Sequence, residues 1–320
     1  MPKFSIITPC YNSFELMSRY FESFINQSYN DFELIIVDDC STDGSYEKLK
    51  EYAKESQKLN IKVTRTADNS GPGNARNKGI EIAESEWITF VDNDDWVSVD
   101  LLAKVNKIIN EYDVNCVIYD YFLKTDKNEQ HMKSMYYGET GIIQLTECMK
   151  YVRNHSVGKF YKLKSVKDIR YPNLRRCEDV AYVCQAIEAC QLSYYLSEPL
   201  YYYYQRKTSL SNKTTIDESD MLQAFGILEK LFLDKYPREI KEKSVTDLLY
   251  GVLLMKCKAR RNRSEVIEYI NSYETKYSEW YECDIINHLG LVKKMFLMSA
   301  KKRLYLPMRL YAFVHTVFLQ

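Results

Sequence analysis

The chain has 320 residues, 46% of them apolar, and its 44 Lys and Arg residues balance 44 Asp and Glu residues. This length suits one large domain or two, and the balanced charge gives no indication of a nucleic-acid partner. Nine cysteines without a Cys-x-x-Cys pair argue against a disulfide framework or a zinc site and favour a reduced, cytoplasmic protein. We expect no secretory leader and no transmembrane segment, because no apolar run has the required length.

Apolar runs alternate with helical stripes through the first hundred residues. Short apolar runs predict buried strands at Phe4–Thr8, Phe32–Val37, Ile61–Thr64 and Trp87–Val91. Helices are predicted between them, the first after a Ser13 cap, the second through Leu49–Ala53 and the third over Asn74–Ala83. This order predicts an α/β fold, a doubly wound and mostly parallel sheet with helices on both faces.

The fourth predicted strand ends in three acids, Asp92, Asp94 and Asp95. The carboxyl ends of parallel strands form the edge at which open α/β sheets bind ligands. Three carboxylates within four residues repel one another unless a cation lies among them, and Mn²⁺ or Mg²⁺ prefers such oxygen ligands. A solvated acidic turn is the alternative interpretation.

The other strand ends have residues suited to a nucleotide diphosphate. Asp39 can accept a hydrogen bond from a base N–H, Tyr11 can lie against a ring, and Arg76 begins a helix whose N-terminus could also meet phosphate. Each also has an ordinary interpretation, as a turn residue, a packing residue or a surface ion pair. No glycine-rich turn follows the first strand, which argues against a dinucleotide-binding or P-loop protein.

Beyond residue 100 the pattern predicts a helix at Leu101–Tyr112 and strands at Val114–Leu123, Tyr194–Leu196 and Leu200–Gln205. The polar segment Lys127–Gly141 is predicted to be a loop. From about Asp217 the apolar spacing is helical to the end. Basic residues alternate with apolar and aromatic ones over 295–320, a pattern typical of an anionic membrane interface or of a seam between subunits.

Four segments resemble family 2 glycosyltransferases of the GT-A fold, in that family's order: Ser5–Asn12, Ile36–Gly44, Asn69–Gly79 and Phe90–Trp96. The resemblance implies a GT-A domain over 1–212 and a helical domain over 213–320. It further implies an inverting, metal-dependent enzyme that moves a hexose or N-acetylhexosamine from a UDP-sugar to a hydroxyl of a glycan, in the synthesis of a capsule or another surface polysaccharide. The alternatives are a nucleotidyltransferase and a non-catalytic nucleotide-sugar-binding subunit.

The same resemblance implies roles for residues of the first three segments. Asp39 and the loop formed by Pro9, Tyr11 and Asn12 would hold the uracil of the donor. Arg76 would face the pyrophosphate.

In the fourth segment, Asp94 and Asp92 match the family's Asp-x-Asp. Asp94 would contact Mn²⁺ or Mg²⁺ directly, and Asp92 would lie nearer the ribose. Asn93 stands where Ser or Ala is commoner, and Asp95 would orient the loop or the sugar.

Two later segments have implied roles. Glu178 and Asp179 resemble the family's catalytic acid pair, and we expect Asp179 to be the base, with Glu178 as the second candidate. Their alternative interpretation is that acids favour the first turn of a helix. Arg206 and Ser209 would close over the diphosphate, although a plain surface loop explains them as well. The expected acceptor is a glycan, either free or linked to a lipid. The enzyme is expected in the cytoplasm or at the inner face of the cell membrane, as a monomer or a homo-oligomer.

Overall fold

The computed structural model of the protein describes residues 1–206 and 218–318. The chain divides into two compact units, the first comprising residues 1–148 and 153–205 and the second comprising residues 149–152 and 206–320. The predicted domain boundary between 212 and 213 lies outside the described residues and stays a prediction. Within the described ranges, no helix combines the length and the apolar character needed to cross a bilayer.

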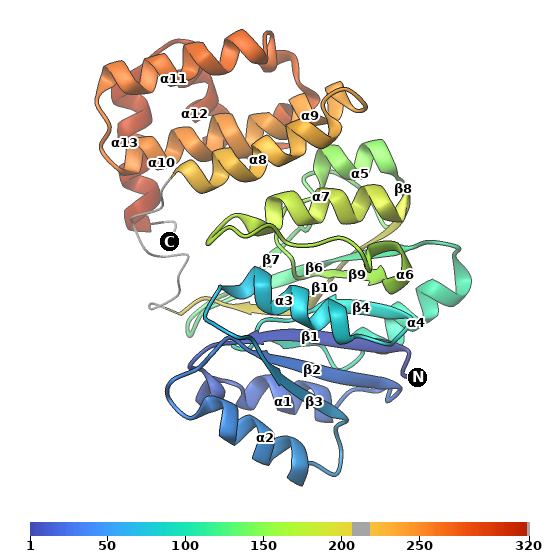
Figure 1. The fold of residues 1–320 in the computed structure, drawn as a ribbon. Coiled ribbons are helices and arrows are strands. Elements are labelled where there is room, and N and C mark those ends of the chain that lie inside the picture. The colour runs from blue at the N-terminus through green and yellow to red at the C-terminus, as the bar shows by residue number, and fades with distance from the viewer. Residues whose placement is uncertain (207–217, 319–320) are drawn as a thin grey trace. The chain divides into compact units, whose positions relative to one another are not determined.

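A ten-stranded sheet forms the centre of the first unit. Its strands are β1 Phe4–Cys10, β2 Phe32–Asp38, β3 Ile61–Arg65, β4 Trp87–Phe90, β5 Trp96–Val97, β6 Cys116–Lys124, β7 Glu129–Met132, β8 Gly141–Gln144, β9 Lys159–Lys162 and β10 Leu192–Tyr204. They lie in the order β3-β2-β1-β4-β9-β6-β10-β5, with β7 beside β6 and β8 beside β10 (Figure 1). Six strands, β1 to β4, β6 and β10, run in one direction, as the predicted mostly parallel sheet requires.

Helices cover the sheet of the first unit. Their bounds are α1 Ser18–Ile25, α2 Ser45–Glu55, α3 Pro72–Ile82, α4 Leu101–Glu111, α6 Leu163–Val166 and α7 Glu178–Cys190, and a 3₁₀ turn, Phe14–Leu16, precedes α1. Helix α5, Leu145–Tyr151, has residues in both units. In Figure 1, α1 and α2 lie on one side of β1 to β3, and α3 lies on the other. This is the two-sided covering expected of a doubly wound sheet.

Alternate residues of β1 explain how both faces are packed. Ile6 belongs to the core cluster that includes Phe24 of α1. Ile7 points to the opposite face, where Gly79 of α3 lies so close that an added Cβ would stand 2.2 Å from the Ile7 Cγ2 atom. Because successive side chains of a strand point to opposite faces, β1 joins the two helical layers. Gly79 is therefore a packing requirement of α3.

The structure differs from the sequence-based boundaries at β1. The strand was predicted to end before Pro9, but it continues to Cys10 and pairs with β2 throughout. The Ile7 carbonyl points to the β4 side and accepts from the Val91 N–H. The Cys10 carbonyl points to the β2 side and accepts from the Asp39 N–H. The N–H that Pro9 lacks would therefore have pointed toward β4. Pairing with β4 has already ended at Ile7, so the strand can continue through Pro9.

Three further predictions were wrong. The polar segment Lys127–Gly141 is not simply a loop, because β7 within it pairs antiparallel with β6. The two tyrosine-rich segments are one strand, β10, with register irregularities between Leu196 and Tyr201. Pro199 lies at this irregularity, which a bulge accommodates within the strand. Ser13 also fails to cap a helix with its side chain, because its hydroxyl meets Cys10 and Asn93 instead.

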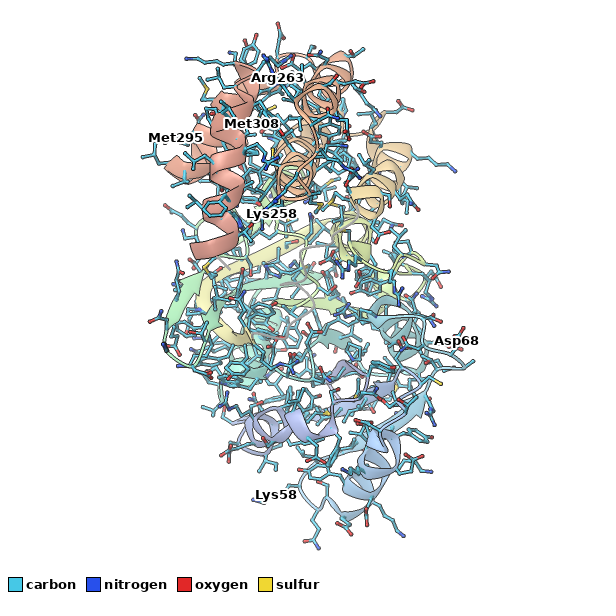
Figure 2. All side chains as sticks on the ribbon, turned by 90° about the vertical axis from the view of Figure 1, so that its left-hand side faces the viewer. Lys58, Asp68, Lys258, Arg263, Met295 and Met308 are labelled. Atoms are coloured by element: carbon cyan, nitrogen blue, oxygen red, sulfur yellow. The ribbon has the colours of Figure 1, made fainter. Side chains whose placement is uncertain are left out.

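The second unit is helical, as predicted. It contains α8 Glu218–Phe232, α9 Pro237–Ser244, a π-helical segment Val245–Val252, α10 Leu253–Lys258, α11 Arg263–Lys276, two 3₁₀ turns at Trp280–Glu282 and Asp284–His288, α12 Leu291–Lys301 and α13 Tyr305–Phe318. The helices bury apolar stripes against one another, with Met308 of α13 fully buried. Met295 of α12 projects outward and is 61% exposed (Figure 2).

Candidate functional site

Three parallel strands bring their carboxyl ends to one edge of the sheet. Cys10 at the end of β1 lies opposite Asp38 of β2, and Ile7 of β1 lies opposite Phe90 at the end of β4. Tyr11 and Asn12 follow β1, Asp39 follows β2, and the acids that begin at Asp92 follow β4. Of the other predicted residues, Pro9 lies within β1 and Arg76 lies on α3. The sheet topology therefore places the loops that contain Tyr11, Asp39 and Asp92 at one edge.

The loop after β1 is fastened to the loop after β2. The Asn12 backbone N–H donates to the Ser41 hydroxyl at 2.9 Å, and the Asn12 carboxamide oxygen accepts from the Thr42 N–H at 2.8 Å. Asn12 adopts a left-handed φ of 48°, a conformation that Asn tolerates better than most residues. Tyr11, by contrast, is 45% exposed at the tip of this loop. The loop thus presents one aromatic ring on a fixed backbone.

Asp39 is buried and organises the turn that leads into α3. Its two carboxylate oxygens accept from the Thr66 hydroxyl at 2.9 Å, the Ser70 N–H at 3.3 Å and the Gly71 N–H at 2.8 Å. Gly71 has a φ of 92°, which favours glycine. The carboxylate predicted to meet a nucleotide base therefore also shapes the loop before Arg76.

Arg76 joins two acids that are far apart in the sequence. It lies on α3, is 6% exposed, and donates to Asp92 at 2.8 Å and to Glu178 at 3.1 Å. Burial alone would lower the pKa of the guanidinium, but the charges of Asp92, Tyr171 and Glu178 outweigh it and raise that pKa. The ring of Tyr171 lies 5.5 Å from the guanidinium carbon. Arg76 is therefore permanently charged and held between the end of β4 and the beginning of α7.

The three acids after β4 point in different directions. Asp95 is fully buried and accepts from the Tyr201 hydroxyl and from the Tyr204 N–H of β10. Burial, followed by the charges of Asp94 and Asp92, raises its pKa well above the usual range of a carboxyl group. Asp92 and Asp94 remain partly exposed. Only these two of the three acids are thus placed to meet a ligand.

Tyr201 supports this turn and was not predicted as a site residue. Its hydroxyl accepts from the Asp92 N–H at 3.2 Å and donates to Asp95. The tyrosine-rich pattern of β10 indicated only packing, and no local signal connects Tyr201 to acids more than a hundred residues earlier. Asn93 turns toward the first loop instead, where its amide contacts the Ser13 hydroxyl.

Glu178 and Asp179 begin α7, after Cys177 in a left-handed conformation with φ 58°. Glu178 is buried against α3, where a Cβ added to Gly73 would stand 2.8 Å from the Glu178 Cγ atom. Asp179 is partly exposed. Burial, followed by the charge of Glu178, raises the pKa of the Asp179 carboxyl to about 7. A carboxyl group with this pKa can exchange a proton near neutral pH.

The described residues contain no cluster of three or more His, Cys, Asp or Glu side chains that could hold a metal ion. Asp95 cannot be a third ligand beside Asp92 and Asp94, because β10 holds both of its oxygens. Two partly exposed carboxylates nevertheless fit a cation such as Mg²⁺, which often takes one or two carboxylates and completes its shell with phosphates and water.

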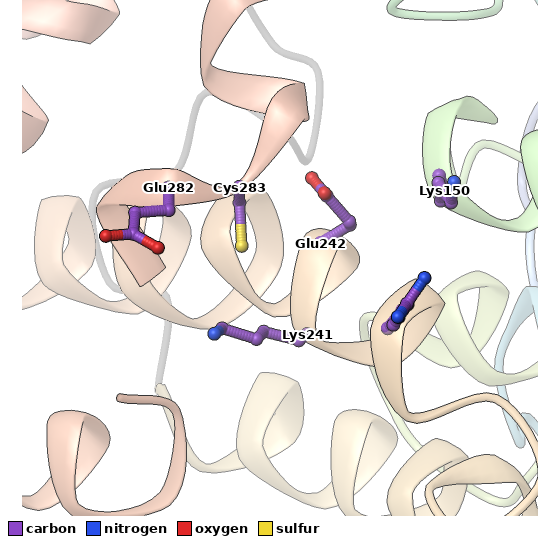
Figure 3. Close-up of a pocket in the computed structure, with 6 residues that line it drawn as sticks. Lys150, Lys241, Glu242, Glu282 and Cys283 are labelled. Atoms are coloured by element: carbon purple, nitrogen blue, oxygen red, sulfur yellow. The ribbon is translucent and has the colours of Figure 1, made fainter. Parts of the chain in front are cut away.

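The remaining predicted residues lie at the limit of what the structure describes. Arg206 is partly buried and directly precedes residues 207–217, and Ser209 falls outside the described residues. A separate pocket of about 300 Å³ belongs to the second unit (Figure 3). None of the predicted site residues lines it; its lining residues are Lys150, Arg238, Lys241, Glu242, Glu282 and Cys283.

Comparisons with known proteins match the whole chain or its first part. A model of the family described as glycosyl transferase family 2 matches residues 5–170. The chain is 28% identical over 314 residues to a poly(ribitol-phosphate) beta-glucosyltransferase of Bacillus spizizenii, covering 90% of this chain and 47% of that protein. It is 31% identical over 209 residues to the poly(ribitol-phosphate) beta-N-acetylglucosaminyltransferase TarS of Staphylococcus aureus, covering 63% of this chain and 35% of TarS. The chain thus spans about half the length, or less, of these two relatives.

A solved structure of S. aureus TarS 1–349 with UDP-GlcNAc has a similar fold. The TM-score is 0.69 at 22% identity, and the match covers 98% of this chain and 91% of that one. The predicted GT-A-type α/β fold with a helical C-terminal region is confirmed.

Proposed function

The chain belongs to glycosyl transferase family 2, and from that premise we propose that it transfers a hexose or N-acetylhexosamine from a UDP-sugar to a hydroxyl of a glycan, with inversion. The observation that best supports this proposal is the chain of ion pairs from Asp92 through Arg76 to Glu178. It connects the acidic end of β4, suited to the donor, with the acid pair of α7, suited to proton transfer.

The donor occupies the carboxyl edge of the sheet in this proposal. Tyr11 lies against the uracil, Asp39 and the loop of Pro9 and Asn12 meet its edge, and Arg76 supports the diphosphate. The exposure of Tyr11 and the fixed backbone of Asn12 support these roles. The solved complexes of TarS with UDP and with UDP-GlcNAc support the choice of a uridine nucleotide.

Asp179 acts as the base. As the acceptor oxygen attacks the anomeric carbon and the bond to UDP breaks, the hydroxyl proton moves to the Asp179 carboxylate. Its pKa of about 7 suits this transfer, because the group is substantially ionised at neutral pH and still basic enough to take a proton. Glu178 is the weaker candidate, since its Oε1 atom already accepts from Arg76.

Arg76 positions this base. Arg76 holds Glu178 in place beside Asp179. The charge of Glu178 raises the pKa of Asp179, whereas the charge of the Arg76 guanidinium lowers it. Asp95 keeps the turn between Asp92 and Asp94 in place through its bonds to β10, so that both carboxylates stay at the sheet edge. Asn93 holds the same turn against the loop that contains Ser13.

Asp94 and Asp92 would hold Mn²⁺ or Mg²⁺ together with the donor phosphates. When bound, such an ion neutralises charge that develops on the departing diphosphate. Asp94 is proposed as the direct ligand, and Asp92, whose Oδ1 atom accepts from Arg76 at 2.8 Å, is proposed to lie nearer the ribose. Arg206 and Ser209 are proposed to close over the same diphosphate.

The acceptor is proposed to be a surface polysaccharide or its lipid-linked precursor, at the inner face of the cell membrane. The names of the two relatives, which both refer to poly(ribitol-phosphate), support a polyol-phosphate or related glycan.

The test is a thermal-shift comparison of nucleotides with Mn²⁺, followed by measurement of UDP release with mixed glycan acceptors. We expect UDP and UDP-sugars to stabilise the protein and CTP or ATP to leave it unchanged. Asp94→Ala should weaken UDP binding in Mn²⁺, and the matched variant Asp113→Ala, at an exposed site, should not. Stabilisation by CTP or ATP without any by UDP would contradict the proposal and favour a nucleotidyltransferase.

A further inference from the structure

Helices α12 and α13 each have two apolar stripes on opposite sides. One stripe is buried within the second unit and contains Phe296, Leu297 and Ala300 of α12 and Met308 and Ala312 of α13. The other stripe is exposed, and we call it the α12–α13 face. Its members are 38% to 76% exposed: Leu291, Val292, Met295 and Met298 of α12, and Leu306, Leu310, Phe313 and Val314 of α13.

The exposed residues keep helical spacing. In α13 they recur at intervals of four, three and one residues, and in α12 at intervals of one, three and three. This places each set on a single side of its helix. Single exposed apolar residues are normal on a soluble protein, but eight on two neighbouring helices indicate an interaction surface.

The charged residues of the segment that contains this face are all Lys or Arg. Residues 285–320 contain six Lys and Arg and no Asp or Glu, whereas the chain as a whole has a formal charge of zero. Lys302 is exposed at the end of α12. Of the six, Arg303 is neutralised by Glu274 of α11. The segment therefore keeps a positive charge beside the exposed apolar residues of the α12–α13 face.

We propose that the α12–α13 face docks on an anionic lipid bilayer, with its apolar side chains in the headgroup and upper acyl region. Amphipathic helices with basic flanks bind such surfaces through buried apolar area and attraction to anionic lipids. Long lysine stems can lie along the apolar surface and keep the ammonium group at the headgroups. The proposal does not depend on which sugar the first unit transfers.

Charge also argues against a second copy of the chain as the partner. A twofold symmetric contact pairs the same patch with itself, so two positive segments would face each other. The repulsion would oppose burial of the apolar residues. An anionic bilayer instead supplies the opposite charge across the whole face.

The test is co-sedimentation of the full chain with extruded vesicles, either phosphatidylcholine alone or a 3:1 mixture of phosphatidylcholine and phosphatidylglycerol. The phosphatidylglycerol gives the second type of vesicle a negative surface potential, which attracts basic segments. We expect at least about tenfold stronger partitioning to the anionic vesicles, weakened by high salt because the attraction is screened. Equal binding to both vesicle types, or none, would overturn the proposal.

Variants distinguish the face from the rest of the surface. The double change Leu310→Ser and Phe313→Ser should reduce partitioning about tenfold or more, because both side chains are over 60% exposed and lose apolar contact with lipid. The matched control, Val99→Ser with Ile142→Ser, removes exposed apolar residues of the first unit and should bind as the unmodified chain does. If both pairs behave alike, the face is not the binding surface.

A double lysine substitution and a measurement of the protein's molar mass complete the test. Lys294→Gln with Lys302→Gln should weaken binding to anionic vesicles and flatten its salt dependence, whereas Lys58→Gln with Lys107→Gln should not. Light scattering without lipid should give a monomer. A dimer that dissociates in the Leu310→Ser and Phe313→Ser variant would overturn the proposal in favour of self-association.

Discussion

The carboxyl edge of the sheet and the α12–α13 face both present charged residues, but they hold them in different ways. At the edge, Arg76 donates hydrogen bonds of 2.8 Å to Asp92 and 3.1 Å to Glu178. These bonds fix the three side chains relative to one another. On the α12–α13 face, long cationic side chains stand beside exposed apolar ones. The first arrangement suits chemistry on a small molecule, and the second suits a broad and adaptable partner.

The largest expected effect comes from the base. Asp179→Asn should lower the rate of sugar transfer by roughly 10²- to 10⁴-fold, because a positioned general base contributes that much, while UDP binding changes little. Steady-state kinetics together with UDP titration measure both quantities. Glu188→Gln, on the same helix, is the control and should keep normal turnover. Near-normal turnover of Asp179→Asn would show that another group takes the proton.

The next largest effect tests how firmly the edge is held. Arg76→Met leaves Asp92 and Glu178 without their buried cation, and breaking a buried ion pair from one side costs about 3–5 kcal/mol. Chemical denaturation should show this loss of stability. Lys78→Met on the same helix removes only an exposed pair with Glu81 and should cost about 1 kcal/mol or less. Equal losses would mean that Arg76 contributes no more than a surface residue.

A smaller effect is expected at Gly73, which lies under the acid pair. A Cβ there would stand 2.8 Å from the Glu178 Cγ atom and 3.2 Å from the Tyr171 Cβ atom, so Gly73→Ala should cost about 1–3 kcal/mol and lower transfer by shifting Glu178. The control is Gly226→Ala in α8, where nothing lies within 4 Å of the added atom. That change should stabilise the protein by about 0.5–1 kcal/mol. A neutral Gly73→Ala would contradict the close packing of α3 and α7.

A further expected effect is a pH dependence of stability that arises from Asp179. Its pKa of about 7 in the folded protein lies above the value of about 3.9 for an unfolded chain, so the folded state binds the proton more tightly. This contribution to stability is complete below about pH 4 and is lost as the pH rises through about 7. Asp179→Asn should therefore gain stability relative to the unmodified chain between about pH 5 and pH 8.

Denaturation midpoints at the two pH values measure this gain. The exposed residue Asp113 provides the control, since Asp113→Asn should show the same difference from the unmodified chain at both values. A constant gap for Asp179→Asn across the range would mean that its pKa is not raised. Transfer by the unmodified enzyme should rise over the same range, as Asp179 loses its proton and becomes able to act as a base.

Local patterns predicted the first half of the sheet because its strands are buried on both faces. β2 and β4 were found within one residue of their ends, since continuous apolar runs mark parallel strands. β5, β7 and β8 were not predicted, because they are short or polar and owe their conformation to a partner strand. β10 was predicted as two separate strands, because a bulge in the interior of a strand has no clear signature in a single sequence.

The same limit applies to the site. The acids at the strand ends could be found, because topology alone brings the carboxyl ends of β1, β2 and β4 to one edge. The directions of their side chains could not be predicted, because Asp95 turns to Tyr201, which is 106 positions away. The link between Arg76 and Glu178 spans 102 positions and depends on the packing of α3 against α7. Such pairings depend on tertiary structure, and sequence spacing does not indicate them.

The most direct test is a crystal structure of the chain with UDP and Mn²⁺. The predicted result is uracil against Tyr11 and beside Asp39, with the diphosphate and the ion at Asp94 and with Asp179 facing the space where the sugar would lie. UDP bound away from this edge, or Asp94 directed away from the diphosphate, would contradict the proposed site.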